Sequence, residues 1–277
     1  MRVLVTGAAG QLGRAIVDRF SSSADVVART RQDLDVACEA DVRHAVQDVR
    51  PDVIVNCSAY NAVDGAEDDA AGALEVNGFA VLALARAARD AGATLVHYGT
   101  DFVFDGRASA PYTETDRPVP ESTYGLSKLL GEWFAAEAPR HYVLRVESLF
   151  GGTRARSSID KILDAIRAGE PARVFIDRTV TPSYVVDVAE ATARLLEIRP
   201  ETGVYHCVNS GATTWLGVAE EAARLLRRDA QLVPVPVASV TMRARRPKYC
   251  ALSNEKLRRA GMDMPTWQDA LARYIGR

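Results

Sequence analysis

Tyr124 and Lys128 stand one helical turn apart in the sequence. On a helix, residues at this spacing lie on one face, one above the other. An ammonium group beside a phenol favours the phenolate and should lower the pKa of the tyrosine. A tyrosine tuned in this way can donate or accept a proton near neutral pH, as acid–base catalysis requires. The spacing also arises by chance, so the chemistry depends on what the rest of the chain places beside the pair.

A glycine-rich turn near the start of the chain could hold the phosphates of a cofactor. Residues 3–5 have the pattern of a buried strand, and apolar residues at helical spacing follow the turn. The turn is G-x-x-G-x-x-G rather than G-x-G-x-x-G, and its residues are Gly7, Gly10, Gln11, Leu12 and Gly13. The glycines would permit the tight turn, the approach of a pyrophosphate and close helix packing. The helix N-terminus would face the phosphates. This context favours nucleotide binding over a purely structural turn.

Basic residues follow the second predicted strand, at 25–28. An NAD-preferring site would place a diol-binding acid there. Arg29 and Arg31 suit a 2′-phosphate instead, so NADPH is expected, with NADH the alternative if both side chains are only solvated. Asp35 and Val36 come next, and Asp35 could accept a hydrogen bond from the adenine amino group or could cap the helix expected at about 39–50.

Two further predicted strands, at 51–56 and 94–98, end in polar residues. Ligands of open parallel sheets bind beyond the carboxyl ends of the strands. The second of these strands leads to Thr100, whose hydroxyl could bond a substrate oxygen. The first leads to a segment that would run past a cofactor: Ser58, Ala59 and Tyr60.

Residues 66 to about 91 are rich in alanine and leucine and are expected to form a long helical stretch. Asn77 lies inside it, although asparagine has a poor helix propensity. Its side chain could bond backbone near a cofactor or could belong to a plain polar face.

Length and composition describe an ordinary globular protein. A chain of 277 residues fits one large α/β domain, or a large domain with a small one. A net charge of -2 argues against a nucleic-acid-binding surface. The four cysteines lack C-x-x-C pairing, which favours a reducing compartment over a zinc or disulfide framework. No signal peptide or run of about 20 apolar residues is recognised. A cytoplasmic location without membrane association is therefore expected.

The glycine turn, the strand-end threonine and Tyr-x-x-x-Lys follow one another as in the extended short-chain dehydrogenases/reductases. In finer detail the chain resembles the dTDP-4-dehydrorhamnose reductase family over nearly its whole length. The likeness is carried by residues 55–67, 100–106, 124–132, 181–189 and 246–247.

The resemblance implies an α/β fold with a Rossmann-type doubly wound parallel sheet. Residues 1–150 would form the NADP-binding domain, and residues 151–277 mainly a smaller substrate-binding lobe, with segments that return to the first domain. By the same resemblance, Thr100, Tyr124 and Lys128 match the catalytic triad, with Asp101 assisting in the substrate pocket.

The implied activity is NADPH-dependent reduction of the C4 ketone of a nucleotide-activated 6-deoxysugar, in deoxysugar biosynthesis. The cofactor would supply the hydride and the protein a proton. The expected partner is the nucleotide sugar, without nucleic acid or metal, and a homodimer is allowed. One alternative is an epimerase or dehydratase, although Phe102 follows Thr100-Asp101 where a dehydratase would carry a glutamate. The other is a non-catalytic NADP-binding subunit of the methionine adenosyltransferase beta type, which an intact triad disfavours.

One departure concerns the sugar pocket. The family often carries a tryptophan after the strand that follows the tyrosine helix, whereas Glu147-Ser148 stands here. The exact sugar, its stereochemistry and the nucleotide base therefore stay open. The candidates for substrate contacts are Phe102, Ser148, Arg178 and Arg246, and a diphosphate could also involve Arg245 and Lys248. Four further residues are expected to have structural roles only. The ring of His206 should be hydrogen-bonded within the fold, and three tryptophans should pack: Trp133, Trp215 and Trp267.

Overall fold

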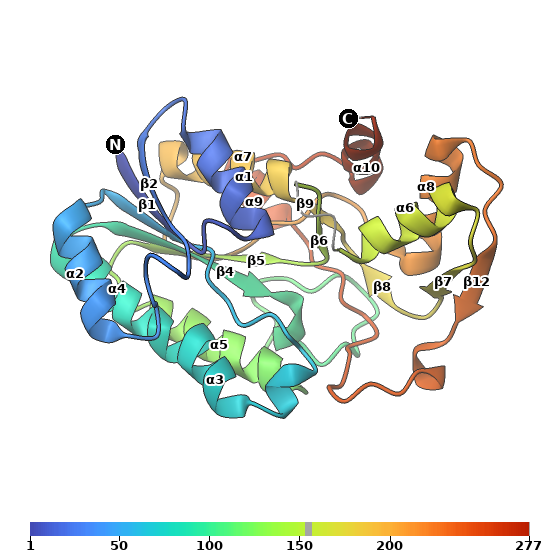
Figure 1. Ribbon diagram of the computed structural model, residues 1–277, viewed down its shortest axis with the longest axis horizontal. Coiled ribbons are helices and arrows are strands. Elements are labelled where there is room, and N and C mark those ends of the chain that lie inside the picture. Colours follow the sequence, from blue (N-terminus) through green and yellow to red (C-terminus); the bar gives the residue numbers. More distant parts are fainter. Residues whose placement is uncertain (153–156, 277) are drawn as a thin grey trace.

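The computed structural model describes residues 1–152 and 157–276. Its centre is a parallel six-stranded sheet with the order β10-β5-β4-β3-β1-β2 (Figure 1). The strands are β1 (Arg2–Thr6), β2 (Asp25–Arg29), β3 (Val53–Asn56), β4 (Thr94–Thr100), β5 (His141–Val146) and β10 (Gly203–His206). Continuous apolar runs such as β3 suit a sheet that is covered on both faces. The predicted Rossmann-type architecture is confirmed.

Helices cover both faces of this sheet (Figure 1). One face carries α1 (Gln11–Phe20), α7 (Val185–Ile198) and α9 (Glu255–Arg259). The other carries α2 (Glu39–Val49), α4 (Ala80–Ala91) and α5 (Thr123–Ala135). Each layer buries its apolar stripe against the sheet, so the site at the strand ends rests on two separate cores.

The helical stretch expected at 66–91 is present, but it is not one regular α-helix. It consists of η1 (Gly65–Glu67), α3 (Ala70–Leu74), the π turn η2 (Glu75–Phe79) and α4. Asn77 lies buried in the π turn, where its Oδ1 accepts from the Tyr60 amide at 2.9 Å. Its Nδ2 donates to the Tyr60 carbonyl and to Ser127 Oγ, each at 3.0 Å. The π turn thus ties the segment after β3 to α5, and π turns are frequent near functional sites.

The stretch Ala70–Ala91 is long and apolar enough to cross a membrane by length and composition alone. Half of its most apolar window is buried inside the protein. A core helix passes the same test, and the buried alanines and leucines of α4 pack on the sheet.

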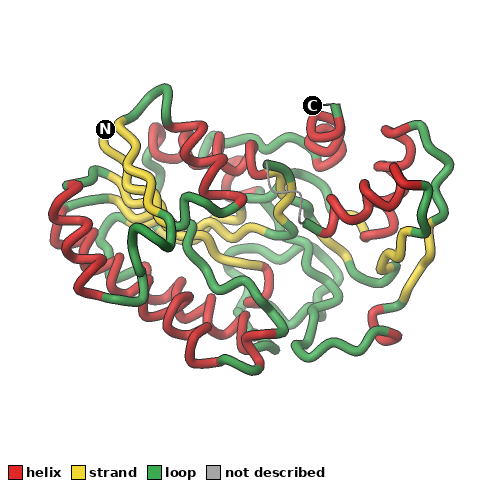
Figure 2. Tube along the Cα trace, in the orientation of Figure 1, coloured by secondary structure: helices red, strands yellow, loops and turns green. Residues whose placement is uncertain are grey.

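A smaller lobe lies beside the sheet, on the right in Figures 1 and 2, with short strands of its own. It contains α6 (Ser158–Ala168), β7 (Ala172–Phe175), β8 (Thr179–Val180), β11 (Thr213–Thr214), α8 (Trp215–Leu226), β12 (Leu232–Val235), η4 (Val237–Ser239) and α10 (Trp267–Ile275). The pair β6 (Leu149–Phe150) and β9 (Ser183–Tyr184) joins the lobe to the sheet. The domain boundary at residue 150 stays a prediction, but α7 and β10 do return to the main sheet.

Buried polar contacts fix α5 against β5. Arg145 of β5 donates to Glu132 of α5 through Nε at 3.0 Å and Nη2 at 2.7 Å. The two side chains are 4% and 3% exposed. The buried ion pair lies one turn beyond Lys128 and holds the helix that carries the two candidate catalytic residues.

Trp133, which follows Glu132 in α5, is 62% exposed, so the packing role expected for it is wrong.

Replacing Glu132 with alanine should destabilise the protein by about 3–5 kcal/mol, because it leaves the Arg145 charge buried without its partner. The free energy of unfolding from urea denaturation measures this. The matched control is Glu197→Ala, which removes an exposed partner of Arg194 and should leave stability near wild type. Equal stability of the two variants would contradict the assigned role.

Candidate active site

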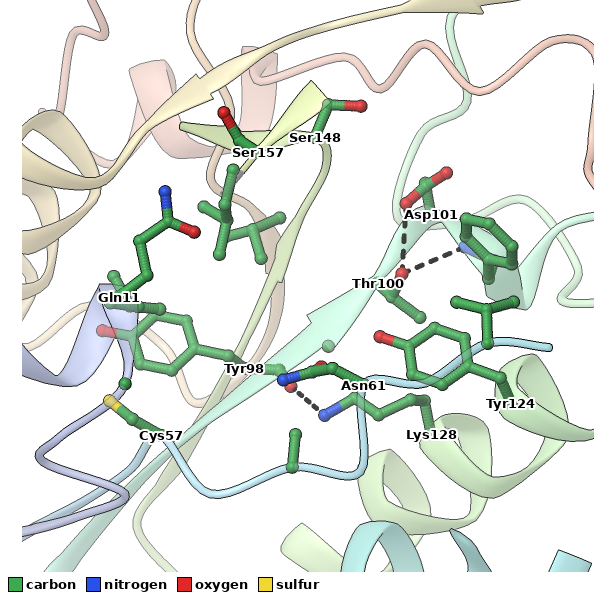
Figure 3. Close-up of a pocket in the computed structure, with 18 of the residues that line it drawn as sticks. Gln11, Cys57, Asn61, Tyr98, Thr100, Asp101, Tyr124, Lys128, Ser148 and Ser157 are labelled. Carbon is green, nitrogen blue, oxygen red and sulfur yellow. Dashed lines mark hydrogen bonds between the residues drawn. The ribbon is translucent and has the colours of Figure 1, made fainter. Parts of the chain in front are cut away.

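A cavity of about 500 Å³ opens beyond the carboxyl ends of β1, β3, β4 and β5. Figure 3 shows Gln11 and Cys57 on one side of it, Thr100 and Tyr124 on the other, and Lys128 between them. Fourteen of the predicted residues line it: Gly10, Gln11, Leu12, Gly13, Ser58, Ala59, Thr100, Asp101, Phe102, Tyr124, Lys128, Ser148, Arg178 and Arg246.

The glycine turn has the shape that a dinucleotide needs. Gly7 has φ +64, and a Cβ there would lie 2.6 Å from the Cys57 carbonyl carbon. A Cβ on Gly13 would lie 2.3 Å from the Gly7 oxygen. Gly10 precedes α1 without a side-chain cap, so the first N–H groups of the helix stay free for an anion. The turn therefore fits a pyrophosphate.

Buried polar groups anchor the segment that faces this turn. Asn56 Oδ1 accepts from Thr6 Oγ1 at 2.8 Å and from the Ser58 amide at 3.1 Å. Asn56 Nδ2 contacts His97 Nδ1 at 3.1 Å, and burial holds the pKa of His97 well below its usual value, so the ring is neutral. The network joins β1, β3 and β4 at the point where the sheet order reverses, which is where such folds bind nucleotides.

Seven predicted cofactor residues do not line the cavity: Gly7, Arg29, Arg31, Asp35, Val36, Tyr60 and Asn77. Gly7 shapes the turn, and Asn77 acts on the Tyr60 backbone. Arg29 ends β2 beside the turn, since its carbonyl accepts from the Ala8 amide at 3.1 Å. In the described part of the chain, neither arginine's guanidinium has an ion pair.

Asp35 does not cap α2. Its Oδ1 accepts from the Ala37 amide at 3.1 Å, and the residue before α2 is Cys38, which makes no side-chain cap. The side chain of Val36 is buried in the core. The capping alternative for Asp35 is therefore wrong, and its contact with adenine stays a prediction.

Local packing places Tyr124 and Lys128. Ser122 begins α5 by accepting from the Gly125 amide at 3.1 Å. A Cβ on Gly125 would lie 2.3 Å from the Phe102 carbonyl oxygen, so only glycine lets α5 pack so tightly against η3 (Asp101–Val103). Lys128 Nζ donates to the Tyr98 carbonyl at 2.5 Å (Figure 3). Both side chains are buried and reach the same cavity as Thr100.

The pKa of Tyr124 differs from the expected direction. Burial raises it, and an ionised Asp101 would add to the effect, while a hydrogen bond with Thr100 opposes it. The ammonium of Lys128 donates to the Tyr98 carbonyl and is not among the groups that shift the pKa of Tyr124. Burial also lowers the pKa of Lys128 itself to about 8. Tyr124 is therefore a neutral phenol in this state, which suits a proton donor.

A ring and two guanidinium groups form one wall of the cavity. The Phe102 ring meets Tyr124 edge-on, with 5.5 Å between centroids. Arg178 and Arg246 lie over Phe102, at 5.5 and 5.9 Å from its centroid. Arg246 also donates to Asp64 at 2.9 Å. These cations could meet an anionic substrate.

Other candidate cations are exposed. Arg245 pairs with Glu121 at 3.3 Å and Lys248 with Asp177 at 3.3 Å. His206 is satisfied as expected, because its Nδ1 contacts the carbonyls of Tyr112 and Ser253 at 3.1 and 3.2 Å.

Some lining residues were not expected from the sequence, among them Asn61, Ser157 and Trp215. Trp215 packs in the core of the lobe as predicted, but it also faces the cavity. Glu147 was noted only as part of the departure after β5, yet it is 2% exposed and lies against Asp101. The position of this charged residue directly after a strand is the sequence feature that could have identified Glu147.

Comparison with known proteins places these features in a family. A family model described as "RmlD substrate binding domain" matches residues 1–277. The dTDP-4-dehydrorhamnose reductase of Burkholderia thailandensis is 35% identical over 98% of this chain and 97% of its own. A probable dTDP-4,6-dihydroxy-2-methyloxan-3-one 4-ketoreductase of Streptomyces antibioticus is 37% identical, covering 98% and 93%. The solved dTDP-4-dehydrorhamnose reductase of Bacillus anthracis, in complex with NADP, has a TM-score of 0.94 at 30% identity, covering 99% and 98%.

Proposed function

The chain belongs to the dTDP-4-dehydrorhamnose reductase family, and we propose that it reduces the C4 ketone of a nucleotide-activated 6-deoxysugar with NADPH, in deoxysugar biosynthesis. One observation carries the proposal: Thr100, Tyr124 and Lys128 reach the same cavity as the phosphate turn at Gly10 and Gly13. A proton donor and a dinucleotide cradle in one cavity are the requirements of carbonyl reduction.

When bound, NADPH supplies the hydride to the carbonyl carbon. Thr100 would orient the carbonyl oxygen through its hydroxyl. Tyr124 would donate its phenolic proton to the oxygen as negative charge develops there. Lys128, a buried cation beside the Tyr98 carbonyl, would hold the cofactor ribose and stabilise the phenolate that Tyr124 becomes.

The C4 ketone sits on a sugar that carries a nucleoside diphosphate. Arg246 and Arg178, which line the cavity, would bind the diphosphate, because guanidinium groups bond phosphate oxygens in a fork geometry. Ser148 and Phe102 would contact the sugar. The homodimer and the cytoplasmic location stay predictions.

The guanidinium groups of Arg29, at the end of β2, and of Arg31, just after it, would favour NADPH over NADH. Replacing both Arg29 and Arg31 with alanine should raise the KM for NADPH by about 10- to 100-fold, the loss of one or two charge-assisted hydrogen bonds. The KM for NADH should change little, because NADH lacks the 2′-phosphate. Steady-state kinetics with both cofactors measure this. An equal change in both KM values would show that the arginines do not bind the 2′-phosphate. The control is Arg43→Ala, which removes an exposed arginine of α2.

A substrate panel tests the proposed function. dTDP-4-keto-6-deoxysugars are incubated with NADPH, its loss is followed by absorbance, and NMR gives the configuration of the product at C4. Consumption of NADPH with reduction at C4 is expected. An epimerase would change the sugar without net loss of NADPH, and a non-catalytic NADP-binding subunit would bind the cofactor but leave every sugar unchanged.

A further inference from the structure

Glu147 and Asp101 form a buried carboxyl pair beside Tyr124. Glu147 follows β5, and Asp101 begins η3. A carboxylate oxygen of each and Cys250 Sγ all lie within 4.8 Å of one another. Glu147 is 2% exposed and Asp101 is 4% exposed. Two carboxylates this close in a buried site cannot both ionise at low cost, so the pair retains one proton near neutral pH.

The hydrogen bonds indicate which carboxyl group holds that proton. Glu147 accepts from three donors, which are the Thr181 amide, the Thr181 hydroxyl at 2.5 Å and the Ser148 hydroxyl at 3.2 Å. Asp101 Oδ1 accepts from Thr100 Oγ1 at 3.1 Å, whereas the buried Asp101 Oδ2 has no hydrogen-bond partner among the described residues. Donors stabilise the ionised form of a carboxyl group. The negative charge therefore belongs on Glu147, and the proton belongs on Asp101.

The described groups around the pair supply one positive charge. Among the described residues, the ionisable groups that act on the pair or feel its charge are Arg178, Cys250 and Tyr124. Arg178 carries one positive charge, which balances one carboxylate but not two. Cys250 donates to the Pro247 carbonyl at 3.2 Å, and burial holds the pKa of its thiol well above the usual value, so it is neutral. Burial raises the pKa of both Asp101 and Glu147.

We propose that Glu147 is a positioning residue that keeps Asp101 protonated, so that no negative charge faces Tyr124 when it gives up its proton. A charge on Asp101 opposes a phenolate on Tyr124. In the proposed reduction, the O–H bond of Tyr124 breaks as a new O–H bond forms on the substrate oxygen, whose carbon has accepted the hydride. A neutral Asp101 makes the resulting phenolate less costly. The inference rests on the proposed function for its kinetic consequences.

Glu147→Gln keeps the shape of the side chain and removes its charge. The pKa of Asp101 then falls, because the neighbouring charge is gone and Arg178 remains. Asp101 is protonated below its pKa and ionises as the pH rises, so activity should persist at low pH. The fall of activity at alkaline pH should begin about 1 to 3 pH units lower in the variant than in the wild-type protein. Lys128, whose pKa burial lowers to about 8, causes a separate decline at higher pH that should not move.

Two control variants separate this effect from a loss of packing. Glu147→Asp keeps the charge and should keep the wild-type pH profile of kcat. Asp187→Asn removes another buried carboxylate, which bonds Asn209 at 2.7 Å and Arg273 at 2.7 Å outside the cavity, and should leave the profile unmoved. An unchanged pH profile in folded Glu147→Gln protein would overturn the proposal.

A second measurement needs no turnover. In protein labelled with ¹³C at its aspartate and glutamate carboxyl groups, the NMR signal of Asp101 should titrate above the usual aspartate range. In Glu147→Gln it should titrate at least one pH unit lower. A normal titration of Asp101 in the wild-type protein would contradict the proposal. If the wild-type protein reduced no keto sugar, the proposed function would be contradicted instead. The NMR titration would still give the protonation state of Asp101.

Discussion

Replacing Tyr124 with phenylalanine is expected to lower kcat by about 10²- to 10⁴-fold, the usual contribution of a general acid. The ring would keep its edge-on contact with Phe102, so packing should change little. The cofactor turn is untouched, and NADPH binding measured by calorimetry or fluorescence should stay near wild type. The loss should therefore appear in kcat and not in the affinity for the cofactor.

The matched control for this variant is Tyr142→Phe. Tyr142 is also buried, in β5, and its hydroxyl donates to the Pro200 carbonyl at 2.9 Å away from the cavity. This variant should lose some stability and keep its turnover. If Tyr124→Phe turned over within about threefold of wild type, against the 10² or more expected of a general acid, Tyr124 would not be the proton donor.

Replacing Lys128 with methionine should lower kcat by about 10²-fold or more and weaken NADPH binding as well. The substitution keeps most of the apolar volume but removes the buried cation and its hydrogen bond to the Tyr98 carbonyl. A phenolate on Tyr124 then forms in a cavity without this buried cation, which makes the proton transfer more costly. Kinetics and cofactor titration on the same preparation separate the two effects.

The pH dependence gives a second test of Lys128. Burial lowers its pKa to about 8. The cation is present below that pH and is lost as the pH rises through it, so wild-type kcat should decline there. The methionine variant should lack this decline. Lys161→Met removes an exposed lysine of α6 and should change neither kcat nor its pH profile.

Much of the site could be predicted because its signals are local. The glycine turn, the strand-end Thr100 and the helical spacing of Tyr124 and Lys128 each need only a few neighbouring residues to be recognised. An open parallel sheet then brings strand ends together at one edge, so their convergence follows from the order of elements. The same logic placed Ser58 and Ala59 correctly in the cavity wall.

Other features depend on what packs against a residue, which a local pattern does not state. Trp133 and Leu126 stand at a helical spacing typical of a buried face of α5. Both are exposed, because no element of the described chain covers them. The pairing of Glu147 with Asp101 joins two distant segments. The direction in which Lys128 points, toward the Tyr98 carbonyl, and the burial that raises the pKa of Tyr124 cannot be seen in the spacing either.

Transfer of deuterium from NADPH labelled at the reactive C4 hydrogen of the nicotinamide tests the proposed reduction most directly. The label is followed by NMR and mass spectrometry in a dTDP-4-keto-6-deoxysugar incubated with the wild-type protein and with Tyr124→Phe. We expect one deuterium at C4 of the sugar in the wild-type reaction and almost none with the variant over the same time. Deuterium that stays on the cofactor with every keto sugar, or transfer that is equally fast without the Tyr124 hydroxyl, would contradict the reduction proposed for this site.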